Sequence, residues 1–305
     1  MFQGGFIINF HPITLADKPL FDSFFHKYRY DNAHSNFTNL FMWRNGYHIQ
    51  WALAGEHLCI KAEWEGEHYI LPPFGPENEG MNTALEQFMD YFAANGWPLV
   101  IRGAEQFMVA ALDRLKPGQF QWVEDRDNFD YVYNTQDLIE LSGRKYHSKK
   151  NHLNSFKRLY SQYEYVALTP ELVPSCLDVA RTWWRQHSDN DDINLGLEQQ
   201  AIADVLQNME YLGLCGGAIS LDGQVIGFTF GERLNEDTVV VHVEKGNPEI
   251  RGVFTVINQE YLKNSWQHIP YVNREEDMGI PGLRKAKESY HPVKMIQKYV
   301  GRLLK

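Results

Sequence analysis

A cluster of basic side chains stands out in the middle of an otherwise acidic chain. No Asp or Glu occurs between Leu141 and Tyr163, although the 305-residue protein carries a formal charge of -10. Cations that lack nearby carboxylates repel one another unless a bound anion neutralises them. The segment therefore indicates a site for a phosphate-bearing ligand such as tRNA, a phospholipid headgroup, CoA or a nucleotide sugar. Its candidate contacts, which include one amide suited to phosphate and sugar, are Arg144, Lys145, Lys149, Lys150, Asn154 and Arg158.

The same segment has a second interpretation. Its apolar residues Leu153, Phe156 and Tyr160 recur three or four positions apart, which is the spacing of a helix that packs one face on the protein body. The bases would then form a solvated helix face, or would pair with acids such as those of "SDNDD" (188–192) or "EDRD" (124–127). The sequence leaves both interpretations open.

A turn near the C-terminal end of the chain could bind a second anionic group. In "NREEDMGIPGLRKAKESY" (273–290), Gly279 and Pro281-Gly282 predict a tight turn before a short helix. Side chains on the first turns of that helix would meet an anion together with unpaired backbone N–H groups. The candidates are Arg284, Lys285 and Lys287.

The same stretch holds carboxylates that could act as a general base. Like charges as close as Glu275, Glu276 and Asp277 raise the pKa of at least one of them if they are buried, and such a group can take a proton from an attacking amine. The alternative is a surface turn in which the charges pair locally, Arg274 with Glu276 and Arg284 with Asp277.

A predicted strand, "VHVEKG" (241–246), carries another candidate. Strand alternation places His242 and Glu244 on one face, and Val241, Val243 and Lys245 on the other. The carboxylate of Glu244 could orient a bound ligand or accept a proton from it. An ordinary ion pair, for example between Glu244 and Lys263, would equally explain this residue.

Several kinds of chemistry find no support in the sequence. The 12 histidines form no H-E-x-x-H motif, and Cys59, Cys176 and Cys215 lie far apart, so we expect no metal site and no disulfide framework. There is no G-x-S-x-G motif and no Walker-type glycine loop. No Cys or Ser stands out as a nucleophile, so we expect no covalent enzyme intermediate.

Composition favours a folded protein in the cytoplasm. The chain is 44% hydrophobic and 14% aromatic, which is enough for substantial cores. Its first residues lack the basic region of a signal peptide, and no stretch approaches the roughly 20 apolar residues of a membrane span. The sequence does not determine the oligomeric state.

The order of predicted elements repeats once along the chain. Each half contains a strand, two helices, three hairpin-linked strands, a helix, a strand, a helix and a final strand. The hairpin-linked strands are expected at 47–53, 57–64 and 67–73, and again at 214–221, 224–234 and 238–246. We therefore expect two copies of one α/β (α+β) mixed-sheet fold, covering residues 1–135 and 136–305 and packed together.

This element order resembles the GNAT (N-acyltransferase) fold, in which a mixed sheet splays open in its middle. Two such halves in tandem resemble the Fem-type aminoacyltransferases and the C-terminal domain of phosphatidylglycerol lysyltransferases. The blocks that carry the resemblance are "DYVYNTQDLIELSGRKYHSKKNHLNSFKRLY" and "NREEDMGIPGLRKAKESYHPVKMIQKY". The resemblance points to a bacterial family grouped with the lysyltransferase domain, most of whose members have no assigned reaction.

The resemblance implies acyl or aminoacyl transfer to an amine or a hydroxyl, with acyl-CoA or aminoacyl-tRNA as co-substrate and no permanently bound cofactor. GNAT enzymes bind CoA through a Q/R-x-x-G-x-G/A loop. In "EKGNPEIRGVF", Glu249 takes the Gln or Arg position and Phe254 takes that of the small residue. The first-half loop, "PPFGPENEGMN", holds two acids and prolines. These departures favour a donor other than CoA, or a donor site that no longer works.

The resemblance also assigns roles to residues. A Tyr near the last GNAT helix often protonates the leaving group, which indicates Tyr290, and the base is then Glu244, Glu275 or Asp277. A different class of function remains open, namely a non-catalytic binding or sensor protein that recognises a phosphate-bearing ligand on a GNAT scaffold.

Overall fold

The computed structural model describes residues 8–187 and 193–304. The chain divides into two compact units, which are Met1–Phe129 with Ile296–Lys305 (unit 1) and Asp130–Met295 (unit 2). Each unit contains one seven-stranded sheet. The mixed α/β class and the duplication expected from the sequence are both present.

Unit 1 is built on a sheet with strand order β1-β2-β3-β4-β5-β14-β6. Neighbouring strands are antiparallel except β4 and β5, which are parallel and share a single register pair, Ile70 with Ile101. The strands are β1 (His11–Pro12), β2 (Gln50–Ala54), β3 (His57–Trp64), β4 (Glu67–Ile70), β5 (Val100–Ala104), β6 (Phe120–Glu124) and β14 (Tyr299–Leu303). The helices are α1 (Lys18–Phe25), α2 (Phe37–Trp43), α3 (Glu79–Ala94) and α4 (Gln106–Leu115).

Helix α3 shows how local sequence sets these elements. The side chain of Asn78 caps the helix by accepting a hydrogen bond from the Gly80 N–H at 2.8 Å. The buried residues Leu85, Phe88 and Phe92 then lie three or four apart and pack in the core with strand residues such as Cys59. Capping and apolar spacing therefore fix where α3 begins and which face it buries.

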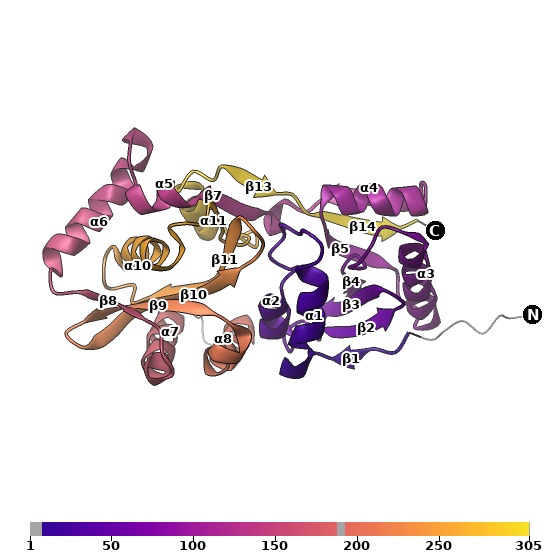
Figure 1. Ribbon diagram of the computed structural model, residues 1–305, viewed down its shortest axis with the longest axis horizontal. Coiled ribbons are helices and arrows are strands. Elements are labelled where there is room, and N and C mark those ends of the chain that lie inside the picture. The colour runs from indigo at the N-terminus through magenta and orange to yellow at the C-terminus, as the bar shows by residue number, and fades with distance from the viewer. Residues whose placement is uncertain (1–7, 188–192, 305) are drawn as a thin grey trace, which may run out of the picture. The chain divides into compact units, whose positions relative to one another are not determined.

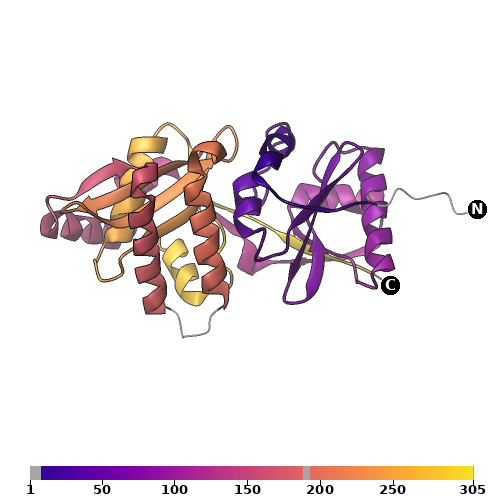
Figure 2. The same cartoon turned by 90° about the horizontal axis from the view of Figure 1, so that it is seen from below.

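Unit 2 has the strand order β13-β7-β12-β11-β10-β9-β8. The strands are β7 (Asp130–Asn134), β8 (Glu164–Ala167), β9 (Cys215–Leu221), β10 (Gln224–Arg233), β11 (Thr238–Gly246), β12 (Tyr271–Asn273) and β13 (Lys294–Ile296). The helices are α5 (Thr135–Glu140), α6 (His147–Leu159), α7 (Val173–His187), α8 (Ile193–Gln207), α9 (Met209–Leu212), α10 (Val253–Tyr261) and α11 (Pro281–Glu288). Figure 1 shows α10 on one face of the sheet and α7 with α8 on the other, and Figure 2 shows α7 and α8 side by side.

The boundary between the units differs from the one expected at 135/136. Strand β7 pairs with β12 in the sheet of unit 2, whereas β14 pairs with β5 and β6 in the sheet of unit 1. The segment expected as one final strand is thus two short strands, β13 and β14, which join different sheets. Sequence patterns identify strands, but pairing decides to which unit each strand belongs.

The sheet of unit 2 opens between the parallel strands β11 and β12. Their last register pair is Val240 with Asn273, and β11 continues to Gly246 without β12 beside it. At the same level, β10 has a register shift: Phe230 faces Val243 and Gly231 faces Val241. His242 is therefore an extra residue on β11, and the expected alternation of faces is interrupted there.

Candidate functional site

A buried ion pair crosses the opening between β11 and β12. Arg274, which follows β12, donates from Nη2 to Oε1 of Glu244 on β11 at 3.1 Å, and the two side chains are 13% and 12% exposed. Asn258 of α10 donates to the other carboxylate oxygen of Glu244 at 3.2 Å. This pair differs from both pairings considered from the sequence, Glu244 with Lys263 and Arg274 with Glu276. The carboxylate of Glu244 is held in a fixed orientation by two donors.

Aromatic rings and a second cation surround this pair. The Arg274 guanidinium lies 5.0 Å from the Tyr290 ring centroid and 5.7 Å from that of Tyr133. Lys149 of α6 places its Nζ 3.9 Å from the same Tyr290 ring. Burial, and then the charge of Arg274, lowers the pKa of Lys149 to about 8. The structure therefore brings together three of the residues predicted from the sequence, Lys149, Glu244 and Tyr290, and adds Arg274, which was considered only as a pairing partner.

The basic helix α6 packs against the N-terminus of α10. Gly252 caps α10 with φ +93°, and a Cβ there would lie 2.9 Å from the His152 carbonyl oxygen and 3.2 Å from Cβ of Phe156. Burial, followed by the charges of Arg251 and Lys149, lowers the pKa of His152. The charges of Arg251 and Lys149 thus lie close to His152 at the start of α10, where α6 and α10 are in direct contact.

The remaining residues of the predicted phosphate site, with one further base of α6, Lys157, fall into two groups. Lys145 pairs with Asp137 at 3.1 Å, and Lys157 pairs with Glu260 at 3.1 Å. The side chains of the second group are exposed, and the described part of the chain offers its three cations no ion-pair partner; the group comprises Arg144, Lys150, Asn154 and Arg158. The acids of 188–192, considered as possible partners, lie outside the described residues.

The turn after β12 is organised around Asp277. Its carboxylate accepts two hydrogen bonds from Arg284 at 2.8 Å, one from the Tyr131 hydroxyl at 2.5 Å and one from the Gly279 N–H at 2.9 Å. Burial alone would raise the pKa of Asp277, but these donors, with Arg284 first, hold it well below its usual range. Asp277 is therefore a poor proton acceptor, and its pairing with Arg284 is one of the local pairs considered from the sequence.

The side chain of Lys287 also binds this turn and does not extend into solvent. Its Nζ donates to the backbone carbonyls of Arg274 and Glu275. Burial, and then the charge of Arg274, lowers the pKa of Lys287 to about 8. Lys285, by contrast, is exposed on α11. Of the three bases expected to bind an anion here, only Lys285 points to solvent without a bond to the turn.

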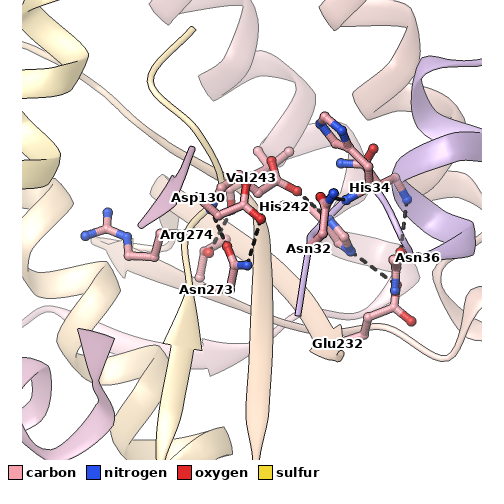
Figure 3. A network of polar contacts seen from close by, with 12 residues as sticks. Asn32, His34, Asn36, Asp130, Glu232, His242, Val243, Asn273 and Arg274 are labelled. Carbon is pink, nitrogen blue, oxygen red and sulfur yellow. Dashed lines mark hydrogen bonds and ion pairs between the residues drawn. The ribbon is translucent and has the colours of Figure 1, made fainter. Parts of the chain in front are cut away.

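A buried histidine lies between two carboxylates beside the opening. The side chain of His242 is 1% exposed, with Nδ1 2.9 Å from Oε1 of Glu275 and Nε2 3.2 Å from Oε1 of Glu232. Burial by itself lowers the pKa of an imidazole, but the hydrogen bonds to both carboxylates raise the pKa of His242 to about 9. Figure 3 draws His242 and Glu232 together with Asn273, which donates to Asp130 at 3.0 Å and ties β12 to β7. The sequence placed His242 on a strand but gave it no partner.

Among residues 8–187 and 193–304, no group of three or more His, Cys, Asp or Glu side chains is arranged to hold a metal ion. No helix in these ranges is both long and apolar enough to cross a membrane.

Comparison with known proteins shows the family. The family model described as "Phosphatidylglycerol lysyltransferase, C-terminal" matches residues 25–302. The chain belongs to this family. A conserved protein of unknown function from Bacteroides thetaiotaomicron is 35% identical, with a TM-score of 0.90 over 97% of this chain and 100% of that one. The resemblance inferred from the two sequence blocks is confirmed.

More distant structures share the fold. L-PGS from Bacillus licheniformis is 14% identical with a TM-score of 0.68, covering 94% of this chain and 92% of that one. FemX is 11% identical with a TM-score of 0.63, covering 97% of each chain. An uncharacterized protein of Mycoplasmoides gallisepticum is 21% identical over 206 residues, which span 63% of this chain and 65% of that relative. The GNAT-like fold of both units is thus shared with lysyltransferase-type and Fem-type structures.

Proposed function

We propose that the lysyltransferase-family chain is an acyl- or aminoacyltransferase whose reacting groups meet at the Glu244–Arg274 pair of unit 2. The observation that carries the proposal is Nη1 of Arg274, which is buried and has no hydrogen-bond partner within the described residues. A buried donor without an acceptor is costly. An oxygen of a bound ligand would satisfy it, and Lys149 above the adjacent ring of Tyr290 would add a second positive charge.

The donor in this proposal is an aminoacyl ester of tRNA. Lys149 and Arg274 would hold an anionic or developing oxyanion oxygen, while the exposed Lys150 and Arg158 of α6 would contact the phosphate backbone. Two features weigh against CoA. Helix α6 lies within contact distance of the N-terminus of α10, and Glu249 places a carboxylate in the preceding loop, where a pyrophosphate would be repelled.

The proposed reaction is a direct transfer. The acceptor nitrogen or oxygen attacks the ester carbonyl, a C–N or C–O bond forms, and the bond to the ribose oxygen breaks. Glu244 takes the proton that the acceptor loses, and Tyr290 gives a proton to the departing oxygen. Burial raises the pKa of Tyr290, so its hydroxyl remains protonated and can donate its proton when the ester bond breaks. Glu275 is the second candidate base. We rank it below Glu244 because its Oε1 is already bound to His242.

A second function is favoured by one observation. Both carboxylate oxygens of Glu244 already accept hydrogen bonds, one from Arg274 at 3.1 Å and one from Asn258 at 3.2 Å, so neither is free to receive a proton from an acceptor. The protein would then bind a phosphate-bearing ligand on the same cationic surface without transferring a group.

The test is to incubate the protein with aminoacyl-tRNA and, separately, with acetyl-CoA, and to measure deacylation and CoA release with small amines present. We expect amine-dependent deacylation of the tRNA that falls roughly 100-fold in Glu244→Gln and tenfold in Tyr290→Phe. The matched control is Glu236→Gln, an exposed hairpin residue, which should keep full activity. Salt-dependent tRNA binding without any deacylation would instead support the binding function.

A further inference from the structure

A buried ammonium group lies on the opposite face of the unit 2 sheet. Lys245, the residue after Glu244 on β11, points towards α7 and α8, and its side chain is 9% exposed. Its Nζ is 2.8 Å and 3.0 Å from the two carboxylate oxygens of Glu198 on α8. The same nitrogen lies 3.6 Å from the ring centroid of Trp183 and 6.0 Å from that of Trp184. One carboxylate and two indoles therefore surround a primary ammonium.

This cage, defined by Trp183, Trp184 and Glu198, is held together by a contact that does not involve the lysine. Trp184 is 2% exposed and donates from Nε1 to Oε2 of Glu198 at 2.7 Å. The bond fixes the carboxylate against α7 and leaves its other oxygen directed at the ammonium. The receptor geometry should therefore persist when the ammonium of Lys245 is absent.

Stability alone does not account for Lys245 at this position. Burial lowers the pKa of Lys245, whereas the charge of Glu198 opposes that change. A buried ion pair contributes little or nothing compared with well-packed apolar side chains of similar volume. An apolar residue on β11 would suit the strand as well, so the stability of the strand does not require an ammonium group at this position.

The cage borders solvent, so a ligand could reach it. The side chain of Glu198 is 23% exposed, and Trp183 is partly exposed. Aromatic faces combined with a carboxylate are the surroundings that proteins use to bind organic cations. The four-carbon chain of Lys245 occupies the space that a linear alkylammonium would fill.

We propose that Trp183, Trp184 and Glu198 form a receptor for a primary alkylammonium ligand, in which Lys245 is the resident competitor. The ligand is a free alkylamine or the amino group of a larger molecule such as an amino-acid ester or amide, and it enters when the lysine side chain withdraws. The site lies on the face of the sheet opposite α10, and its binding is independent of the acyl transfer proposed above.

The experiment uses Lys245→Ala in the full chain, which keeps Cβ and leaves a space the size of n-propylammonium in place of Cγ, Cδ, Cε and Nζ. Calorimetric titration with n-propylammonium should show saturable binding at least about tenfold tighter than in the wild type, because no lysine competes. The uncharged n-propanol should not bind, and adding Glu198→Gln should abolish ammonium binding. Titrations with 1,5-diaminopentane and with lysinamide then distinguish a free alkylamine from an amino-acid source.

Two controls keep the proposal falsifiable. Lys245→Val supplies a strand-compatible side chain if the alanine variant does not fold. Folded variants that bind alkylammonium no more tightly than the wild type would overturn the proposal. Absence of binding to the wild type at ligand concentrations about 100-fold above the variant's Kd would also overturn the proposal. It would mean that the Lys245 side chain does not leave the cage. Loss of transferase activity in Glu244→Gln would leave these titrations unchanged.

Discussion

The protonation of His242 predicts how the free energy of unfolding changes with pH. The imidazole has a pKa of about 9 in the folded protein, because Glu275 and Glu232 bind its two nitrogens. Its unfolded value is about 6.5. Each pKa unit corresponds to about 1.4 kcal/mol, so the rise amounts to about 3 kcal/mol of folding free energy. Since the folded pKa is the higher one, this stabilisation is complete below about pH 6.5 and is lost as the pH rises through about 9.

The assay is urea unfolding of the wild type and of His242→Gln at about pH 6 and about pH 10. Glutamine cannot titrate, so the difference in unfolding free energy between the two proteins should shrink by about 3 kcal/mol over this range. His268→Gln removes an exposed histidine and should show no such change. Lys149 and Lys287 titrate in both proteins and cancel in the difference. A difference that stays constant with pH would refute the inference that His242 carries a proton in the native state.

Three further predictions follow from the site. Arg274→Met should destabilise the protein by about 3–5 kcal/mol, because Glu244 is left buried without its partner, and adding Glu244→Gln should recover part of that loss in a double-mutant cycle of unfolding free energies. Gly252→Ala should cost more stability than Gly223→Ala: both have positive φ, but only Gly252 lies against another helix. Lys149→Met should weaken tRNA binding about tenfold in a filter-binding assay and flatten its salt dependence, and an unchanged affinity would remove Lys149 from the site.

The hairpin strands of unit 2 could be predicted closely from the sequence. Strand β11 (Thr238–Gly246) has the bounds that were expected, and β9 and β10 differ from expectation by one residue each. The reason is local: Asp222 and Gly223 both have positive φ and form the tight turn that their residue types favour. Signals of this kind depend only on neighbouring residues.

The centre of the site could not be predicted in the same way. The pairing of Arg274 with Glu244 depends on how far two parallel strands diverge, and the contacts of His242 depend on a register shift on the neighbouring strand. Neither feature can be inferred from the spacing of residue types in the sequence. The bases of α6 were recognised as a group, but the carboxylates that neutralise Lys145 and Lys157 come from just outside the acid-free segment and from α10.

The position of β14 has a consequence for how the protein folds during synthesis. This strand lies between β5 and β6 in the sheet of unit 1, yet it follows all of unit 2 along the chain. Until the ribosome has made it, β5 and β6 each present an unsatisfied edge, which is a template for pairing with another nascent chain. Unit 1 is therefore translated before unit 2 but completed after it, and deletion of residues 299–303 would damage the half that is translated first.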